Sequence, residues 1–214
     1  MPQLFSPRAN GLVRLLIAVV LLGVVVGVVV LYGLTFSPYA TGQNRVPRQP
    51  VPFSHQHHVG ALGIECGYCH TSFDRSPFAG MPDTATCMSC HSQLWTSADM
   101  LAPVRESLKT SRPLAWVRVH DLPDFVYFNH QAHVNNGVGC ESCHGRVDRM
   151  PLMRQARPLT MQWCLDCHRD PGPQLREGDR ITAMGHTPEG PGDEFIQEYD
   201  ITTDRLTECV TCHR

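Results

Sequence analysis

One stretch of the chain is continuously apolar, and no other stretch compares with it. Residues 15–34 read LLIAVVLLGVVVGVVVLYGL and carry no charged side chain. At about 1.5 Å per residue, a helix of this length spans about 30 Å, the thickness of a bilayer's hydrocarbon core. The run exceeds the usual apolar region of a cleaved signal peptide, and no small-x-small cleavage site follows it. The pattern therefore predicts an uncleaved, single-pass transmembrane anchor.

The flanks of this run predict its immediate surroundings. Residues 1–14 form a short tail before it, and residues 35–52 contain four prolines, which favour an extended, semi-rigid connector. Two arginines lie on each side of the run, so the loop charges do not decide its orientation. The chemistry of the remaining chain has to decide it.

From residue 53 onwards, hydrophobic and polar positions follow no long helical or strand period. Segment 97–110 is the best candidate for a helix, and the prolines and glycines of segment 169–192 predict an irregular connection. The region is rich in Pro, Gly, His and Cys and has a single lysine, Lys109. Such a chain struggles to bury enough apolar surface to offset its conformational entropy. We expect something other than polypeptide at its centre.

All ten cysteines fall into five copies of the pattern Cys-x-x-Cys-His, the attachment signature of c-type haem. In that chemistry the two thiols add to the haem vinyl groups, and the adjoining imidazole becomes the proximal iron ligand. Five copies that use every thiol predict five covalently bound haem c groups. The copies are Cys66–Cys69–His70, Cys87–Cys90–His91, Cys140–Cys143–His144, Cys164–Cys167–His168 and Cys209–Cys212–His213, called motifs 1 to 5 below.

Two other cysteine chemistries are weaker interpretations. Structural zinc uses paired Cys-x-x-Cys, but it does not require a histidine directly after every second cysteine. A disulfide framework needs compatible spacings across the fold, and a Cys-x-x-Cys pair bridges poorly to itself outside redox sites.

The net charge and the chemistry of haem attachment limit the possible partners, location and fold of the chain. The formal net charge of −2 gives no basic surplus, so no nucleic-acid partner is expected. Bacterial c-type haem is attached outside the cytoplasmic membrane, so we expect the haem domain on the periplasmic face of the bacterial cytoplasmic (inner) membrane. The predicted fold class is a multihaem cytochrome c, mostly irregular with short α-helices and a haem-packed core, plus one N-terminal transmembrane helix.

A repeat divides the haem domain. FSHQHHVGALGIECGYCH from Phe53 aligns, with one gap, to FNHQAHVNNGVGCESCH from Phe128, and the shared frame is Phe-x-His-Gln-x-His-Val before a haem motif. A second haem motif follows each copy, so the pattern indicates duplication of a dihaem unit. The predicted regions are a cytoplasmic tail (1–14), an anchor (15–34), a connector (35–52) and a pentahaem domain (53–214) with modules 53–91 and 128–168 and a C-terminal haem at 209–213.

The repeat also singles out candidates for the second axial ligand, which low-spin electron-transfer haem takes from His or Met. Each copy carries two histidines at i and i+3, His55 and His58 in the first and His130 and His133 in the second. Two such side chains lie on one side of a helical turn and cannot bind the same iron face. We expect each to serve a different haem, which would hold neighbouring haems in close contact.

The fifth distal ligand is less clearly marked. His120 lies just before the second repeat, where Asp121 or Asp124 could orient its free ring nitrogen, and it is our fifth candidate. His186 and Met161 are further candidates, and methionine on one iron would raise that haem's potential. His57 has no counterpart in the second repeat, so we interpret it as a surface side chain.

The segments PFSHQHHVGALGIECGYCH, VRVHDLPDFVYFNHQAHV and MQWCLDCHR carry a family resemblance. The Phe-x-His-x-x-His frame before Cys-x-x-Cys-His resembles small multihaem cytochromes of the class III type. With the anchor and the five motifs, residues 10–214 resemble the ActA family, the pentahaem cytochrome c subunits of bacterial alternative complex III. The resemblance implies partners in a membrane quinol-oxidising complex: polytopic quinol-site subunits, an iron–sulfur subunit and a monohaem cytochrome c. It also implies electron relay toward a periplasmic cytochrome or copper-protein acceptor.

Three other functions stay open. A self-contained quinol dehydrogenase of the NapC/NrfH type also has one N-terminal anchor, but here a proline-rich connector separates the anchor from motif 1. A periplasmic multihaem reductase keeps one iron open, often through Cys-x-x-Cys-Lys, which is absent from this sequence. A periplasmic electron-storage or metal-reducing cytochrome is the third. The sequence contains no catalytic residue set, and we expect the chain not to be catalytic alone.

Overall fold

The computed structural model describes residues 6–213. The chain divides into two compact units, Met1–Gly42 and Gln43–Arg214, which we call the anchor unit and the haem unit. Each is described here by itself.

The anchor unit is built on helix α1 (Pro7–Thr35), in which the predicted anchor lies. Ser6 caps the helix by accepting a hydrogen bond from the amide of Ala9, and a proline occupies its first turn. The most apolar 18-residue window of Arg8–Thr35 has a mean hydropathy of 3.2 and is not buried within the protein, and the segment is long and apolar enough to cross a membrane. Of the predicted tail, residues 1–5 lie outside the described residues, and the rest from Pro7 onwards belongs to α1.

A short helix interrupts the segment expected to be extended. α2 (Pro38–Thr41) forms a single turn because Ser37 caps it and Pro38 starts it with a φ already suited to a helix. It ends at Gly42, whose φ of 73° is left-handed and favours glycine. The proline content of this region therefore starts one helical turn instead of extending the chain throughout.

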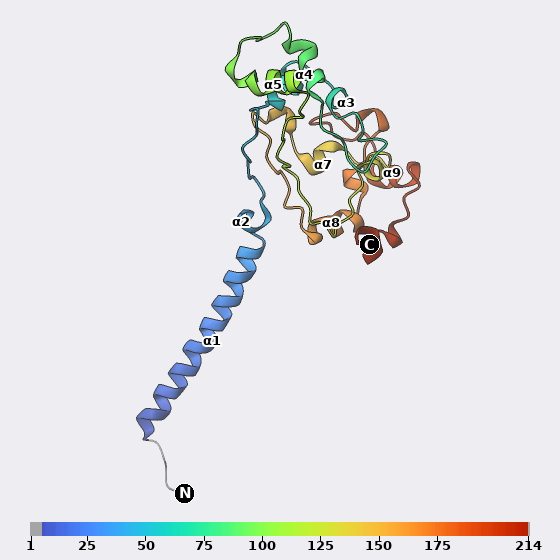
Figure 1. The fold of residues 1–214 in the computed structure, drawn as a ribbon. Coiled ribbons are helices and arrows are strands. Elements are labelled where there is room, and N and C mark those ends of the chain that lie inside the picture. Colours follow the sequence, from blue (N-terminus) through green and yellow to red (C-terminus); the bar gives the residue numbers. More distant parts are fainter. Residues whose placement is uncertain (1–5, 214) are drawn as a thin grey trace. The chain divides into compact units, whose positions relative to one another are not determined.

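The haem unit consists of short helical pieces joined by long irregular segments, and no β-strand occurs among its described residues (Figure 1). This confirms the predicted fold class. The predicted helix at 97–110 is present, and segment 169–192 has only two 3₁₀ turns before its final residue. The α-helices are α3 (Cys66–Cys69), α4 (Thr84–His91), α5 (Ala102–Thr110), α6 (His130–Val134), α7 (Cys140–His144), α8 (Met161–Arg169), α9 (Gly192–Glu198) and α10 (Cys209–Cys212). A π-helical turn, η1 (Gln56–Ala61), and 3₁₀ turns η2 (Asp99–Leu101), η3 (Val147–Arg149), η4 (Gly172–Gln174), η5 (Gly178–Arg180) and η6 (Thr203–Arg205) complete the unit.

Buried apolar side chains are scarce in this unit. The main cluster joins Val51, Leu101 and Val104, with Trp116 and Leu114 packed partly against it. Over the described residues, the buried apolar side chains are Val51, Leu101, Val104, Val134, Val147, Met150, Leu175 and Phe195. Eight such side chains are far fewer than a polypeptide of this length needs to fold by burial alone.

Candidate haem-binding site

Every Cys-x-x-Cys pair lies within a single helical turn. α3, α7 and α10 begin at the first cysteine of motifs 1, 3 and 5, whereas α4 and α8 begin three residues before it. In α4 and α8 the extra turn is capped by side chains, since Asp83 accepts from the amide of Thr86 and Thr160 from that of Trp163. Cysteines at i and i+3 share one face of their turn, where both thiols can reach one bound group.

No disulfide joins any of the ten cysteines. Burial raises the pKa of the Cys143 thiol to about 12 and that of Cys140 to about 11. The thiols of other motifs contribute next, Cys167 and Cys164 to the shift of Cys143 and Cys66 to that of Cys140. Thiols from different motifs therefore lie close together. Among residues 6–213, no group of three or more His, Cys, Asp or Glu side chains is arranged to hold a metal ion directly.

Four of the motif histidines face a histidine from the repeat frame. In each pair the ring centres are a little over 6 Å apart, and two of the pairs are almost parallel. The pairs, with centroid separation and interplanar angle, are His55–His70 (6.5 Å, 6°), His58–His91 (6.2 Å, 61°), His130–His144 (6.3 Å, 8°) and His133–His168 (6.1 Å, 31°).

These separations fit one iron between two imidazoles. A metal–imidazole bond is about 2 Å long and the ring centre lies about 1 Å behind the bonding nitrogen, so two axial imidazoles have centres about 6 Å apart. Direct stacking would bring the rings much closer than that. The paired histidines and the paired thiols thus fit haem c, which would supply the iron and the redox chemistry.

Hydrogen bonds orient most of these rings. On each of seven histidines, Nδ1 lies within hydrogen-bond distance of a backbone carbonyl oxygen. A carbonyl can only accept, so Nδ1 carries the proton and Nε2 keeps its lone pair for a metal. The carbonyls belong to Gly80 for His70, Leu94 for His91, Leu206 for His168, Phe125 for His213, Ser54 for His58, Pro77 for His130 and Asn129 for His133, at 2.8–3.1 Å.

The two repeats hold their histidines in the same way. Phe53 meets His55 edge-on at 5.0 Å and stacks on His58 at 4.3 Å. Phe128 meets His130 edge-on at 4.8 Å and stacks on His133 at 4.5 Å. The phenylalanine at the head of the shared frame therefore positions both histidines of its repeat, and its place in that frame is the sequence signal for this role.

The fifth proximal histidine lacks such a partner. Among residues 6–213 no histidine ring contacts that of His213, whose ring neighbour is Phe125 at 5.8 Å. His120 instead contacts His144, with ring centres 4.3 Å apart, and its Nε2 is buried without a hydrogen-bond partner. Burial, followed by the nearby His130, lowers the pKa of His120 to about 4, so its imidazole is neutral at physiological pH.

The lesser candidates lie in settings less suited to a ligand. Nε2 of His186 is 2.8 Å from a carboxylate oxygen of Glu177, so the nitrogen that would bind iron already has a partner. Met161 exposes 66% of its surface. His57 is exposed and stacks on Trp95 at 6.1 Å, as expected for a surface side chain.

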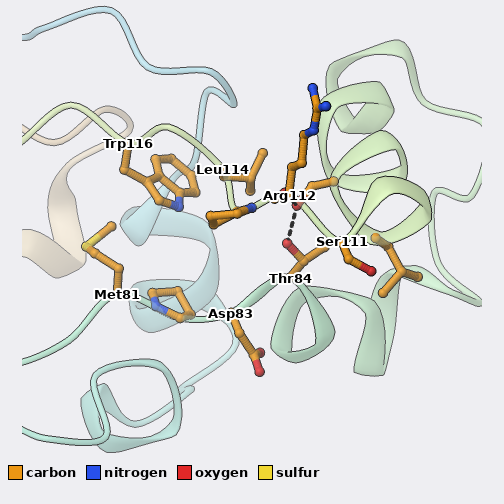
Figure 2. A pocket seen from close by; sticks show the side chains of 11 residues that line it. Met81, Asp83, Thr84, Ser111, Arg112, Leu114 and Trp116 are labelled. Atoms are coloured by element: carbon orange, nitrogen blue, oxygen red, sulfur yellow. Dashed lines mark hydrogen bonds between the residues drawn. The ribbon is translucent and has the colours of Figure 1, made fainter.

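An open cavity of about 430 Å³ lies beside the start of α4, apart from the histidine pairs (Figure 2). Its lining includes Met81, Asp83, Thr84, Arg112 and Trp116, but no motif cysteine or histidine. The Thr84 and Ser107 hydroxyls at its wall are hydrogen-bonded, and Ser107 donates to the carbonyl of Arg112. The cavity therefore borders motif 2 without containing its candidate ligands.

Close packing of η1 against η3 gives a first testable prediction. A Cβ on Gly60 would collide with the backbone carbonyl of Asp148, so Gly60→Ala has to push the two turns apart. We expect the free energy of unfolding to fall by about 1–3 kcal/mol and the melting temperature to fall by about 5 °C. Both are measured by circular dichroism on the purified haem protein. Gly178→Ala is the matched control, because the nearest atom to its added Cβ would be the Tyr199 hydroxyl oxygen at 3.7 Å. Equal melting temperatures for the two variants would contradict the prediction.

Comparison with known proteins identifies this architecture. Residues 126–214 match the family described as cytochrome c7 and related cytochrome c. A curated relative, the menaquinone reductase multiheme cytochrome c subunit of Nitratidesulfovibrio vulgaris (strain Hildenborough), is 31% identical over 166 residues. The matched region covers 77% of this chain and 67% of the relative. Both similarities are to cytochromes c.

Proposed function

Because this chain belongs to the multihaem cytochromes c, we propose that it carries five haem c groups and relays electrons as one subunit of a quinone-linked membrane complex. The observation that carries the proposal is the set of four imidazole pairs, each spaced for one iron. Iron held by two imidazoles stays six-coordinate and exchanges electrons without binding substrate. The chain therefore works as a conduit, and quinone chemistry belongs to partner subunits.

The four histidine pairs assign a distal ligand to each of four haems. We number the haems by their motifs and assign His55 to haem 1, His58 to haem 2, His130 to haem 3 and His133 to haem 4. Each module of the repeat then holds two haems through one turn, and haem 5 completes the domain that begins at residue 53.

For haem 5 we propose His120. Its Nε2 is buried without a partner, and an iron would satisfy that nitrogen. It lies five residues before Phe125, whose carbonyl accepts the hydrogen bond of the proximal His213. The competing His186 has its Nε2 engaged by Glu177.

The apolar helix of the anchor unit supports a membrane location, and we propose that the haem unit lies on the periplasmic face of the bacterial inner membrane. In the arrangement that resembles alternative complex III, quinol is oxidised by a polytopic subunit, and electrons pass through an iron–sulfur subunit and this chain. A monohaem cytochrome c, then a periplasmic cytochrome or copper protein, receives them.

The name of the curated relative favours electron flow in the opposite direction, toward the quinone. That protein is a subunit of a menaquinone reductase, in which electrons arrive at the quinone. The same imidazole-paired haems serve either direction, because the direction depends on the potentials of the partners.

The test is purification from native membranes in mild detergent, with the isolated chain as the control. We expect a haem-staining band near 23.9 kDa plus the haem masses, co-purifying with polytopic subunits. Added menaquinol should reduce the haems of the complex but not those of the isolated chain. Steady quinol oxidation by the isolated chain would instead support a self-contained quinol dehydrogenase, and quinone reduction driven by a periplasmic donor would support electron flow toward the quinone.

A further inference from the structure

Building on the proposed function, we infer that the haems follow the order 2–1–3–4–5, with haem 5 beside both haem 4 and haem 3, so that electrons enter and leave through haems 2 and 5. The order along the sequence would place haem 1 at an end. The contacts described below place it between haem 2 and haem 3. Each link in the line rests on contacts between the segments that hold the two haems.

Haems 1 and 3 are joined by reciprocal packing of the two modules. The distal turn of module 2 packs on the segment that follows motif 1, where His130 donates both its backbone amide and its Nδ1 proton to the carbonyl of Pro77, at 3.1 and 2.9 Å. The distal turn of module 1 packs on the segment that follows motif 3. There the amide of Gln56 donates to the carbonyl of Met150 at 3.0 Å, and Gly60 lies against Asp148.

Residues inside this junction also indicate that haem 1 lies beside haem 3. Burial lowers the pKa of His144 to about 3, and the nearby histidines that add to this shift include His70 and His55, the pair assigned to haem 1. Burial raises the pKa of the Cys140 thiol, and the nearby Cys66 of motif 1 adds to that shift. Each module therefore packs against the segment after the other's first haem motif, and haems 1 and 3 meet at the centre of the unit.

Haem 2 joins haem 1 on its other side. His55 and His58 project from one turn, and Phe53 lies against both rings. Between the motifs themselves, the hydroxyls of Tyr68 in motif 1 and Ser89 in motif 2 are hydrogen-bonded at 2.8 Å.

Haems 3, 4 and 5 continue the line in the opposite direction. His130 and His133 share a turn against Phe128, as in module 1, and place haem 4 beside haem 3. His168 of motif 4 donates from Nδ1 to the carbonyl of Leu206, three residues before motif 5, at 2.8 Å. Burial and then the nearby Cys212 raise the pKa of the Cys164 thiol, which agrees with haem 5 lying beside haem 4. His120, assigned to haem 5, has its ring centre 4.3 Å from that of His144, so haem 5 also lies beside haem 3.

Exposure marks the two ends. Of the ten motif thiols, eight are half-buried, and the two exposed ones are Cys90 of motif 2 and Cys209 of motif 5. Within the haem unit of Figure 1, α4 and the C-terminal motif lie at opposite ends, with α7 between them and α8 beside the C-terminus. Electron partners that dock at the edges of haems 2 and 5 would therefore reach the ends of the line directly.

The direct test is to locate the five irons in the holoprotein, purified as the full chain or its complex, by anomalous diffraction or cryo-electron microscopy. We expect the iron of motif 2 to have one near neighbour, the iron of motif 1 to lie between those of motifs 2 and 3, and the iron of motif 5 to lie beside those of motifs 4 and 3. An iron of motif 2 adjacent to that of motif 3, or an iron of motif 1 at an end, would overturn the order. The chain could carry five haems and exchange electrons with quinone even if the order of the haems were different. The iron positions therefore test the order separately from the proposed function.

A second readout compares two variants from the same turn, His55→Met on haem 1 and His58→Met on haem 2. Methionine ligation raises the potential of one haem, which is then reduced first and becomes silent in electron paramagnetic resonance. Loss of its magnetic coupling should perturb two other ferric signals in His55→Met and one in His58→Met. Two perturbed signals in His58→Met would contradict a terminal haem 2, and if either methionine fails to bind, the iron positions still decide.

Discussion

Haem-free protein should show an anchor unit that survives proteolysis and a haem unit that does not. Eight buried apolar side chains cannot offset the entropy of ordering the haem unit, so the macrocycles must supply its core. We expect the full chain, produced in detergent without haem attachment, to be cleaved throughout residues 43–213 about a thousandfold faster than the holoprotein. That factor corresponds to the loss of about 4 kcal/mol of stability.

The experiment is limited proteolysis with mass-spectrometric mapping of the fragments. Helix α1 serves as an internal control, because detergent covers its apolar surface whether or not haem is attached. A compact, protease-resistant haem unit without haem would contradict the prediction and would show that the polypeptide forms its own core.

Removing one distal imidazole should change the spin state of one haem and leave the others alone. In His133→Ala the iron paired with His168 loses its second axial ligand, and in His130→Ala the iron paired with His144 does. We expect about one fifth of the haem to become high-spin in each variant, seen in optical and electron paramagnetic resonance spectra, with a large loss of electron throughput.

His57→Ala is the matched control. This histidine lies next to His58 in the sequence, but it is exposed and stacks on Trp95 instead of facing a motif histidine. Its removal should leave all the haems low-spin. If the haems also stay low-spin in both His130→Ala and His133→Ala, the ligand assignment from the repeat is wrong.

Much of this molecule could be predicted because its determinants are local. A thioether motif occupies five consecutive residues, a membrane helix is one continuous apolar run, and the repeat frame spans a single turn before each motif. The helix at α5 and the irregular segment before the last motif were likewise visible in composition and turn residues.

The rest depends on contacts between segments far apart in the sequence. Nothing local indicates that His130 meets Pro77 or that Gly60 meets Asp148, since those contacts join two different modules. The position of His120 beside His144 also arises from tertiary packing, and no sequence period predicts it. The prediction of an extended connector is wrong at α2, because proline favours the first position of a helix as well as extended chain, and Ser37–Pro38 starts a helical turn.

The π-helical turn in module 1 shows how a module can accommodate an inserted residue. Module 1 has one residue more than module 2 between its second frame histidine and its haem motif, and it is η1, not α6, that takes the wider turn. The amide of Leu62 reaches back five residues to the carbonyl of His57, so the surplus residue is absorbed as a local bulge. Single-residue insertions or deletions at this point should therefore be tolerated in descendants of the ancestral duplication, provided that the two imidazoles keep their spacing.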